Sequence, residues 1–313
     1  MTRFVANGLT VSADFQLPGL DDAESAALPR LAVTLTEPCE LGEAWSGCDG
    51  PSLWQGCLGD GQPLKVERGA LGDFLYTYGD RAQFLLGPAG DTLLCAPTRE
   101  ALDWQRVLLS KVLPIVSVLL GYEALHASAV ESPQGTVAIL APSGIGKTTL
   151  AAELMRRGWP LVCDDILTLG ASPDGVLAHP GTPHMNLGES GIQVDAIGES
   201  LGVLAGERWI AASAYSQRAL PVCMICLLER GPEPLAEAQR MPQSPIALAP
   251  YMLGLHEDSG RQARRFSLYA ELAGSVSMVA LRGGRADLGR EAADLIVSEL
   301  EAAPTPMRER VSA

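Results

Sequence analysis

The chain has 313 residues and a net charge of −14 at pH 7, with 47% hydrophobic and 5% aromatic residues. This length is enough for one large hydrophobic core or two modest ones, and the apolar content is typical of a folded protein. The acidic surplus provides no global positive field, so neither nucleic acid nor a membrane surface is expected as a partner. Any anion that the protein binds has to be held locally.

The N-terminal sequence MTRFVANGLTVSADF lacks the continuous apolar stretch of a secretory signal. The most apolar run, 107–120, is interrupted by Lys111 and Pro114 and is too short to span a bilayer. Seven cysteines include one C-x-x-C, Cys223 and Cys226, but the pair lies in an apolar strand pattern and is interpreted as core thiols rather than a metal or redox site. A cytoplasmic location fits these features.

Local patterns predict an α/β fold in which a P-loop domain with a central mixed sheet follows a smaller β-rich N-terminal domain. Residues 1–97 contain short β-rich runs separated by Gly, Pro and Asp, which is typical of a mostly antiparallel sheet. Residues 98–121 have apolar residues at helical intervals and are expected to form a buried bridging helix. From 122 to 313, strand and helix patterns alternate, which predicts the catalytic domain.

Within the predicted catalytic domain, residues 124–130 and 136–141 are expected to pair as a hairpin around 131–135. A turn-rich stretch at 171–190 is long enough to form a substrate loop or a mobile lid. Further strands are predicted at 222–228 and 275–284, and a final helix at 286–302.

The sequence APSGIGKTT at 141–149 matches the phosphate-binding pattern [AG]-x-x-x-x-G-K-[ST]. An apolar strand precedes it and a helix is predicted from Lys147, which is the context that the pattern requires. The glycines let backbone amides converge on an anion at a helix N-terminus, whereas the alternative is a plain glycine turn capped by Thr148. The predicted ATP-binding residues are Ser143, Gly144, Ile145, Gly146, Lys147, Thr148 and Thr149, with Lys147 also catalytic.

The metal that accompanies ATP is expected to be Mg²⁺, with the Thr148 hydroxyl as one ligand. Only three of the 23 basic residues are lysines, Lys65, Lys111 and Lys147, so a lysine inside the glycine loop indicates a need for a compact ammonium group.

Two adjacent carboxylates, Asp164 and Asp165, follow the strand pattern WPLVC. If this strand runs parallel to the one ending at Leu140, both end at the same edge of the sheet, and the aspartates lie beside the bound phosphates. Such a pair can divide the tasks of metal binding and general base catalysis, while a turn or helix-capping pair is the structural alternative. In the predicted hairpin His126 faces Leu140, which places it at the mouth of the loop.

The segments LHASAV, APSGIGKTTLAAELMRRG and LVCDD, taken together, resemble the catalytic domain of the HPr serine kinase/phosphorylase family from about residue 125 to residue 169. The resemblance implies transfer of a phosphoryl group from ATP to a serine hydroxyl. It further implies that Asp164 is the general base, that Asp165 lies near Mg²⁺, and that His126 positions or polarises the site. The family's E-x-R-G-x-G segment is absent, which puts phosphorolysis and an HPr partner in doubt.

The organisation of the whole chain more closely resembles the kinases of lasso-peptide biosynthesis, which phosphorylate a serine of a precursor peptide. The favoured substrate is therefore a peptide or small protein that carries a serine. The alternatives are an HPr kinase acting on a phosphocarrier protein, a nucleotide-switched adaptor without transfer, and a small-metabolite kinase. The residue patterns do not fix the oligomeric state, so a homo-oligomer stays open.

Two weaker signals accompany the loop. His179 and His184 lie near the predicted site but at no recognised metal spacing, and we expect them to be incidental. The cluster Arg261, Arg264 and Arg265 is either a site for an acidic peptide or phosphate, or an ordinary charged surface, and the second is favoured.

Overall fold

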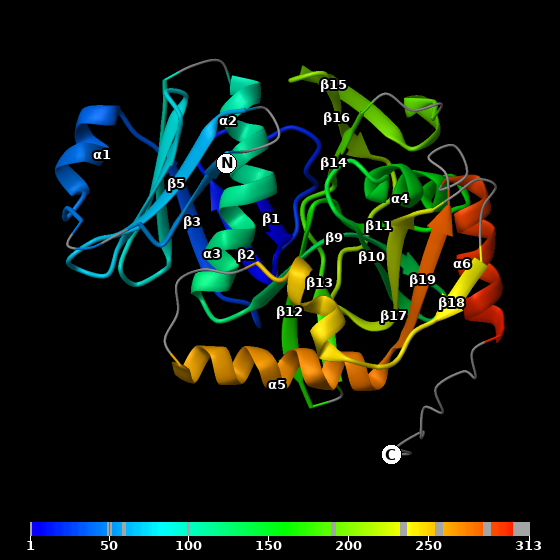
Figure 1. Ribbon diagram of the computed structural model, residues 1–313. Coiled ribbons are helices and arrows are strands. Elements are labelled where there is room, and N and C mark those ends of the chain that lie inside the picture. Colours follow the sequence, from blue (N-terminus) through cyan, green and yellow to red (C-terminus); the bar gives the residue numbers. More distant parts are fainter. Residues whose placement is uncertain are drawn as a thin grey trace.

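The computed structural model describes residues 2–48, 50, 52–57, 61–98, 101–173, 175–188, 192–231, 237–253, 259–283 and 289–302. These residues form a mixed α/β structure with two large sheets and a small third sheet (Figure 1). The α/β class predicted from the sequence is therefore confirmed.

The first half of the chain is mostly β-structure followed by one helical run. Its elements are β1 (Thr2–Ala6), β2 (Leu9–Ala13), β3 (Arg30–Leu35), α1 (Pro38–Ala44), β4 (Trp54–Cys57), β5 (Pro63–Arg68), β6 (Phe74–Tyr78), β7 (Ala82–Leu86), β8 (Thr92–Pro97), α2 (Ala101–Val107), the π-helical turn η1 (Leu108–Val112) and α3 (Leu113–Leu119).

The second half alternates strands and helices. Its elements are β9 (Glu123–Ser132), β10 (Gly135–Leu140), α4 (Lys147–Arg156), β11 (Leu161–Cys163), β12 (Ile166–Ser172), β13 (Gly175–His179), β14 (His184–Leu187), η2 (Val194–Ala196), β15 (Gly198–Leu204), β16 (Glu207–Ala212), β17 (Leu220–Arg230), β18 (Glu237–Arg240), η3 (Pro245–Tyr251), α5 (Ser259–Ser275), β19 (Ser277–Gly283) and α6 (Arg290–Ala302).

The N-terminal sheet has the strand order β1-β2-β3-β8-β7-β6-β5-β4. Its pairings are antiparallel except for β2–β3 and β3–β8, so the mostly antiparallel prediction holds with two parallel exceptions. Apolar residues of its inner face pack against the helical run α2-η1-α3, which Figure 1 shows between this sheet and the second half of the molecule. The helical residues 101–119 lie within the predicted helix 98–121, and most of their apolar side chains are buried, whereas Leu102 is 36% exposed.

The second sheet contains the strands on which the candidate site is built. β10 lies between its antiparallel neighbour β9 and its parallel neighbour β17, and β17 continues to β19. The other edge of β9 pairs with β11 and β12, and β12 leads through β13 back to β17. Because β11 and β10 are both antiparallel to β9, they run in the same direction, as predicted, with β9 between them.

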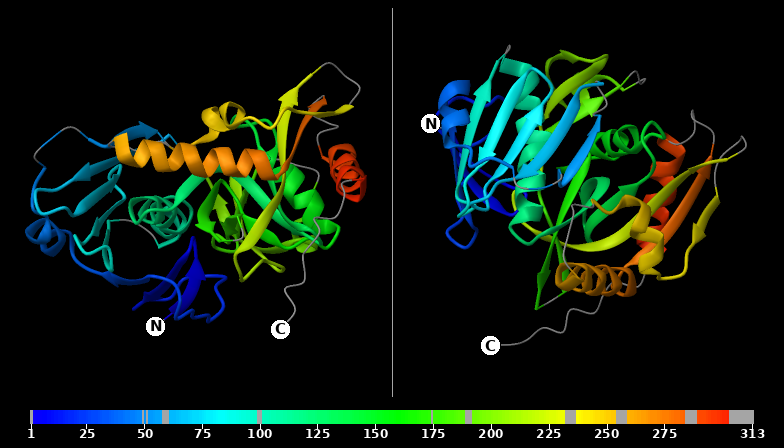
Figure 2. Two further views of the ribbon diagram at one scale, coloured as in Figure 1. Left: turned by 90° about the horizontal axis from the view of Figure 1, so that it is seen from below. Right: turned by 60° about the vertical axis from the view of Figure 1, so that its left-hand side comes forward.

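Helices cover both faces of the second sheet. Alternate residues of β10, β17 and β19 pack on one face against α4 and α6, and the intervening residues pack on the other face against α5. This alternation follows from the opposite side-chain directions of successive strand residues. Figure 2 shows α5 and α6 as separate layers around the strands.

Two local predictions are wrong. The stretch 171–190 is not a long loop, because its described residues include the end of β12, all of β13 and all of β14, and β14 belongs to the small sheet β14-β16-β15. The β9–β10 hairpin pairs Thr136 with Glu131 and Leu140 with Ala127, one residue away from the predicted register. The reason is a two-residue turn, Pro133 and Gln134, between paired Ser132 and Gly135.

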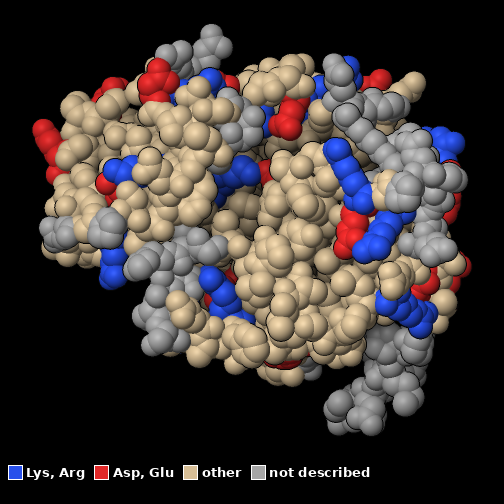
Figure 3. All heavy atoms as spheres, in the orientation of Figure 1, with Lys and Arg blue, Asp and Glu red and all other residues tan. Residues whose placement is uncertain are grey.

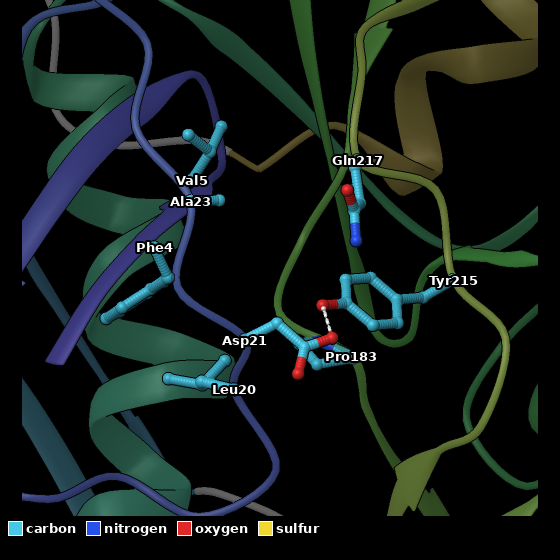
Figure 4. Close-up of a pocket in the computed structure, with 8 residues that line it drawn as sticks. All are labelled: Phe4, Val5, Leu20, Asp21, Ala23, Pro183, Tyr215 and Gln217. Atoms are coloured by element: carbon cyan, nitrogen blue, oxygen red, sulfur yellow. Dashed lines mark hydrogen bonds between the residues drawn. The ribbon is translucent and has the colours of Figure 1, made fainter.

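A small cavity lies where the N-terminal segment meets the second half of the chain (Figure 4). The Tyr215 hydroxyl donates a hydrogen bond to the Asp21 carboxylate at 2.7 Å across it. Its volume of about 20 Å³ suits a single water molecule, so this cavity is not the candidate active site.

Charged residues are dispersed over the surface. On the face shown in Figure 3, Lys and Arg atoms alternate with Asp and Glu atoms and with large areas of other residues. None of the helices in the described part of the chain combines the length and the apolar character needed to cross a bilayer.

Candidate active site

The glycine loop lies between the end of β10 and the start of α4. Gly144 and Gly146 have φ angles of +77° and +126°, in the region that favours glycine. A β-carbon at either position would meet nothing within 4 Å, so there is open space beside both glycines. An open turn of this shape at a helix N-terminus fits a phosphate group.

Lys147 is folded back over the loop and is only 7% exposed. Its Nζ donates to the Ala141 carbonyl at 2.9 Å and lies 3.0 Å from His126 Nε2. Burial lowers the pKa of Lys147, and the charges of Asp165 and Asp164 oppose that shift. The ammonium group is therefore held beside both predicted aspartates.

Asp164 is fixed by three hydrogen bonds. Its Oδ1 accepts from Thr148 Oγ1 at 2.8 Å and from Ser128 Oγ at 2.6 Å, and its Oδ2 accepts from the backbone N–H of Asn186 at 2.9 Å. Burial raises the pKa of Asp164, as does the charge of Asp165, while these hydrogen bonds oppose the rise. Asp164 is thus a rigid carboxylate that directly contacts the hydroxyl predicted to bind Mg²⁺.

Asp165 lies at the break between β11 and β12 and has a φ of +74°, which is uncommon for a residue other than glycine. Its carboxylate forms a salt bridge with Lys111, and its Oδ1 lies 3.7 Å from His126 Nδ1. Burial alone would raise the pKa of Asp165, but Lys111, His126 and Lys147 outweigh it and bring the pKa to about 2. The carboxylate is therefore ionised at neutral pH, and its side chain keeps 29% of its surface exposed.

His126 lies between Lys147 and Asp165, the partner of Lys111. Its Nδ1 lies 3.0 Å from the Asp165 carbonyl oxygen, which can only accept, so Nδ1 carries the proton and Nε2 accepts from Lys147. Burial lowers the pKa of His126, and the charge of Lys147 lowers it further. The imidazole is neutral at pH 7 and acts as a spacer between Lys147 and Asp165.

The predicted site residues come together despite the one-residue error in the hairpin. His126 pairs with Ile166 of β12 and still reaches the loop through Lys147. The aspartates reach the same edge of the sheet as the loop because β11 and β10 run in the same direction.

Some residues of the site were not predicted from the sequence. Ser128 and Asn186 hold Asp164, and Arg230 Nη2 donates to the Gly144 carbonyl at 3.4 Å. Lys111 binds Asp165 although the two residues are 54 positions apart in the sequence. What marks Lys111 in the sequence is its charge within an apolar helical run.

The secondary signals lie outside the site. His184 is buried against Trp209 and hydrogen-bonds the Pro18 carbonyl at 2.9 Å, while His179 packs edge-on against Tyr122. Arg261 and Arg265 pair with Glu123 rather than with the loop. The cysteines of the C-x-x-C are free thiols, and the second is fully buried.

The residues present fit a nucleotide with Mg²⁺ better than a metal held by protein alone. Among the described residues, no group of three or more His, Cys, Asp and Glu side chains could hold a metal ion. Mg²⁺ in nucleotide sites commonly needs only one or two protein oxygens, because phosphates and water supply the rest. Thr148 and Asp164 provide such oxygens at the open side of the loop.

Comparisons with known proteins find similarity among solved structures. No protein-family model matches the sequence, and no curated protein matches it. Among solved structures, the Hpr(Ser) kinase/phosphatase from Coxiella burnetii is similar, with 16% sequence identity and a TM-score of 0.32. The similarity covers 57% of this chain and 97% of that one.

Proposed function

We propose that the protein is an ATP- and Mg²⁺-dependent kinase that transfers the γ-phosphoryl group to a serine hydroxyl of a peptide or small protein. One observation carries the proposal: an open glycine loop at the start of α4 lies beside two carboxylates in different environments, Asp164 against Thr148 and Asp165 against Lys111 and His126. Bound MgATP supplies the phosphoryl group, and the protein supplies position and charge.

The contacts favour a division of labour opposite to the one that the family resemblance implied. Asp164 accepts a hydrogen bond from the Thr148 hydroxyl, which leaves the oxygen lone pairs of Thr148 free for a metal. We therefore place Asp164 and Thr148 on the metal side. Asp165, whose carboxylate is bound by Lys111 rather than by Thr148, takes the acceptor side, in place of Asp164.

On the acceptor side, Asp165 accepts a hydrogen bond from the serine hydroxyl and later its proton. Its low pKa keeps it ionised and ready to orient that hydroxyl. Lys147 has three N–H donors and uses one on Ala141 and one on His126, so the third is available for a phosphate oxygen. The neutral His126 keeps Lys147 and Asp165 apart while hydrogen-bonding to both residues.

A peptide acceptor is supported by the sequence resemblance to the kinases that act on lasso-peptide precursors. An HPr-type phosphocarrier protein is the alternative acceptor. An adaptor that only binds the nucleotide would need no second carboxylate beside the loop, so the position of Asp165 favours transfer.

The proposal is tested by incubating the purified protein with MgATP and a panel of peptides that end in serine, followed by mass spectrometry. The same peptides with alanine in place of serine, and reactions with EDTA, are the controls. We expect a gain of one phosphate on the serine peptides only, and only with Mg²⁺. ATP binding without transfer to any peptide, phosphocarrier protein or hydroxyl metabolite would contradict a kinase function and support the adaptor alternative.

A further inference from the structure

Lys111 reaches the candidate site from outside the second sheet. It lies in η1, the π-helical turn between α2 and α3, and its Nζ forms a salt bridge with Asp165. Its neighbours Leu109 and Val112 are buried in the core of the N-terminal half. A charged side chain inside such an apolar run is costly unless it has a partner, and Asp165 is that partner.

The local helix geometry is unusual at this point. A π-helical turn contains more residues per turn than an α-helix, and such turns occur frequently at functional sites. The backbone departs from α-geometry over Leu108–Val112, the segment that carries the lysine. On the other side of the contact, Asp165 has its positive φ, so both partners stand on non-standard backbone.

The two lysines near Asp165 are engaged differently. Lys147 donates two hydrogen bonds, to the Ala141 carbonyl and to His126, whereas Lys111 binds the Asp165 carboxylate directly.

We propose that Lys111 is a positioning residue for phosphoryl transfer, which holds the Asp165 carboxylate in the orientation that accepts the serine hydroxyl. This inference rests on the proposed function. It makes the helix α2-η1-α3, and through it the N-terminal half, part of the active site. A purely structural salt bridge is the competing explanation, and kinetic measurements on variants separate the two.

The test uses full-length protein and the best serine peptide from the panel. Lys111→Met removes the charge and keeps the length of the side chain, and Lys111→Gln replaces it if the methionine variant does not fold. Lys65→Met is the matched control, because Lys65 also pairs with a carboxylate, Glu67 at 2.7 Å, and lies on β5 of the N-terminal sheet. Each variant is measured for kcat, for the KM of ATP, for the Kd of MgADP and for thermal unfolding.

We expect Lys111→Met to lower kcat about 100-fold, because a misplaced Asp165 carboxylate costs on this order. The KM of ATP and the Kd of MgADP should stay within about threefold, since Lys111 does not contact the loop, and Lys65→Met should behave as the wild type. In an Asp165→Asn background, Lys111→Met should cause no further loss, because the lysine acts through that carboxylate.

Three results would overturn the inference while leaving the kinase function intact. They are wild-type kcat in Lys111→Met, a loss of MgADP affinity as large as that in Lys147→Met, and a full additional loss in the double variant. Absence of transfer by the wild type would instead refute the proposed function, and the inference would fall with it. The two failures are distinguishable because the second appears before any variant is made.

Discussion

Two regions of the molecule bring basic side chains against a buried or partly buried carboxylate. At the candidate site, Lys111, Lys147 and His126 surround Asp165. At the start of α5, Arg261 and Arg265 surround Glu123. The sequence alone drew attention to both, to the first as a phosphate site and to the second as a basic cluster.

The two regions differ in how their hydrogen bonds are used. The arginines also donate to the carbonyls of Val118, Tyr122 and Leu253, and so join α5 to the end of α3, to the residue before β9 and to the segment after η3. The Glu123 side chain is 7% exposed, whereas that of Asp165 is 29% exposed. The first arrangement therefore stabilises the fold, while the second keeps charge available to a ligand.

The largest expected effect is a loss of catalytic rate from a substitution that leaves the fold intact. Asp165→Asn should lower the rate of serine phosphorylation about 1,000-fold, because it removes the base and replaces one acceptor oxygen by an NH2 donor. The Kd of MgATP should change by less than about threefold. Steady-state kinetics and calorimetric titration measure the two quantities, and a variant that retains full activity would remove Asp165 from the proposed role.

The converse change removes the carboxylate of the Glu123 cluster and should lower stability without changing the rate of catalysis. Glu123→Ala leaves two arginines without their carboxylate and should lower the free energy of unfolding by about 3 kcal/mol. Urea denaturation measures this loss. The kcat per folded molecule should stay at the wild-type value, and a large fall in kcat with unchanged stability would show that this cluster takes part in function.

His184 lies outside both regions, and its effect on stability can be measured through its pH dependence. Burial lowers the pKa of His184 to about 4 from its ordinary value of 6.5, and the hydrogen bond to Pro18 offsets only part of the shift. The unfolded chain therefore binds the proton more readily, so stability is complete above pH 6.5 and falls as the pH decreases towards 4.

This histidine should cost up to about 3 kcal/mol of unfolding free energy between pH 7 and pH 4. Urea unfolding of the wild type and of His184→Gln at both pH values separates its contribution from that of other groups. An equal loss in both proteins would rule out His184 as the source.

The smallest effect concerns the loop itself. Gly146→Ala places a β-carbon at a φ of +126°, which should cost about 1–2 kcal/mol through backbone strain, although the space is open. MgATP affinity should fall about tenfold as the loop shifts. Unchanged affinity and stability, measured by calorimetry and urea denaturation, would show that the left-handed geometry is not required.

The sequence predicted those parts of the site that depend on local order. The glycine loop, the strand before it and the helix after it follow from one motif and its flanking patterns, and the direction of β11 follows from the usual crossover. The edge on which Asp164 and Asp165 lie was predictable for that reason.

The remaining features depend on contacts that local patterns do not encode. The hairpin register depends on whether the turn contains two or three residues, and Pro133 and Gln134 suffice. Lys111 meets Asp165 only because the bridging helix packs beside β9 and β12. The stretch 171–190 contains Gly and Pro at a density typical of loops, yet β13 and β14 find partners in β12, β17 and β16.

The most direct test of the account is a crystal structure of the protein with Mg²⁺ and a non-hydrolysable ATP analogue. The account predicts a triphosphate in the loop at 144–148, the metal on the side of Thr148 and Asp164, and the Asp165 carboxylate facing the γ-phosphate with Lys111 beside it. A nucleotide bound elsewhere, or a γ-phosphate directed away from Asp165, would contradict it.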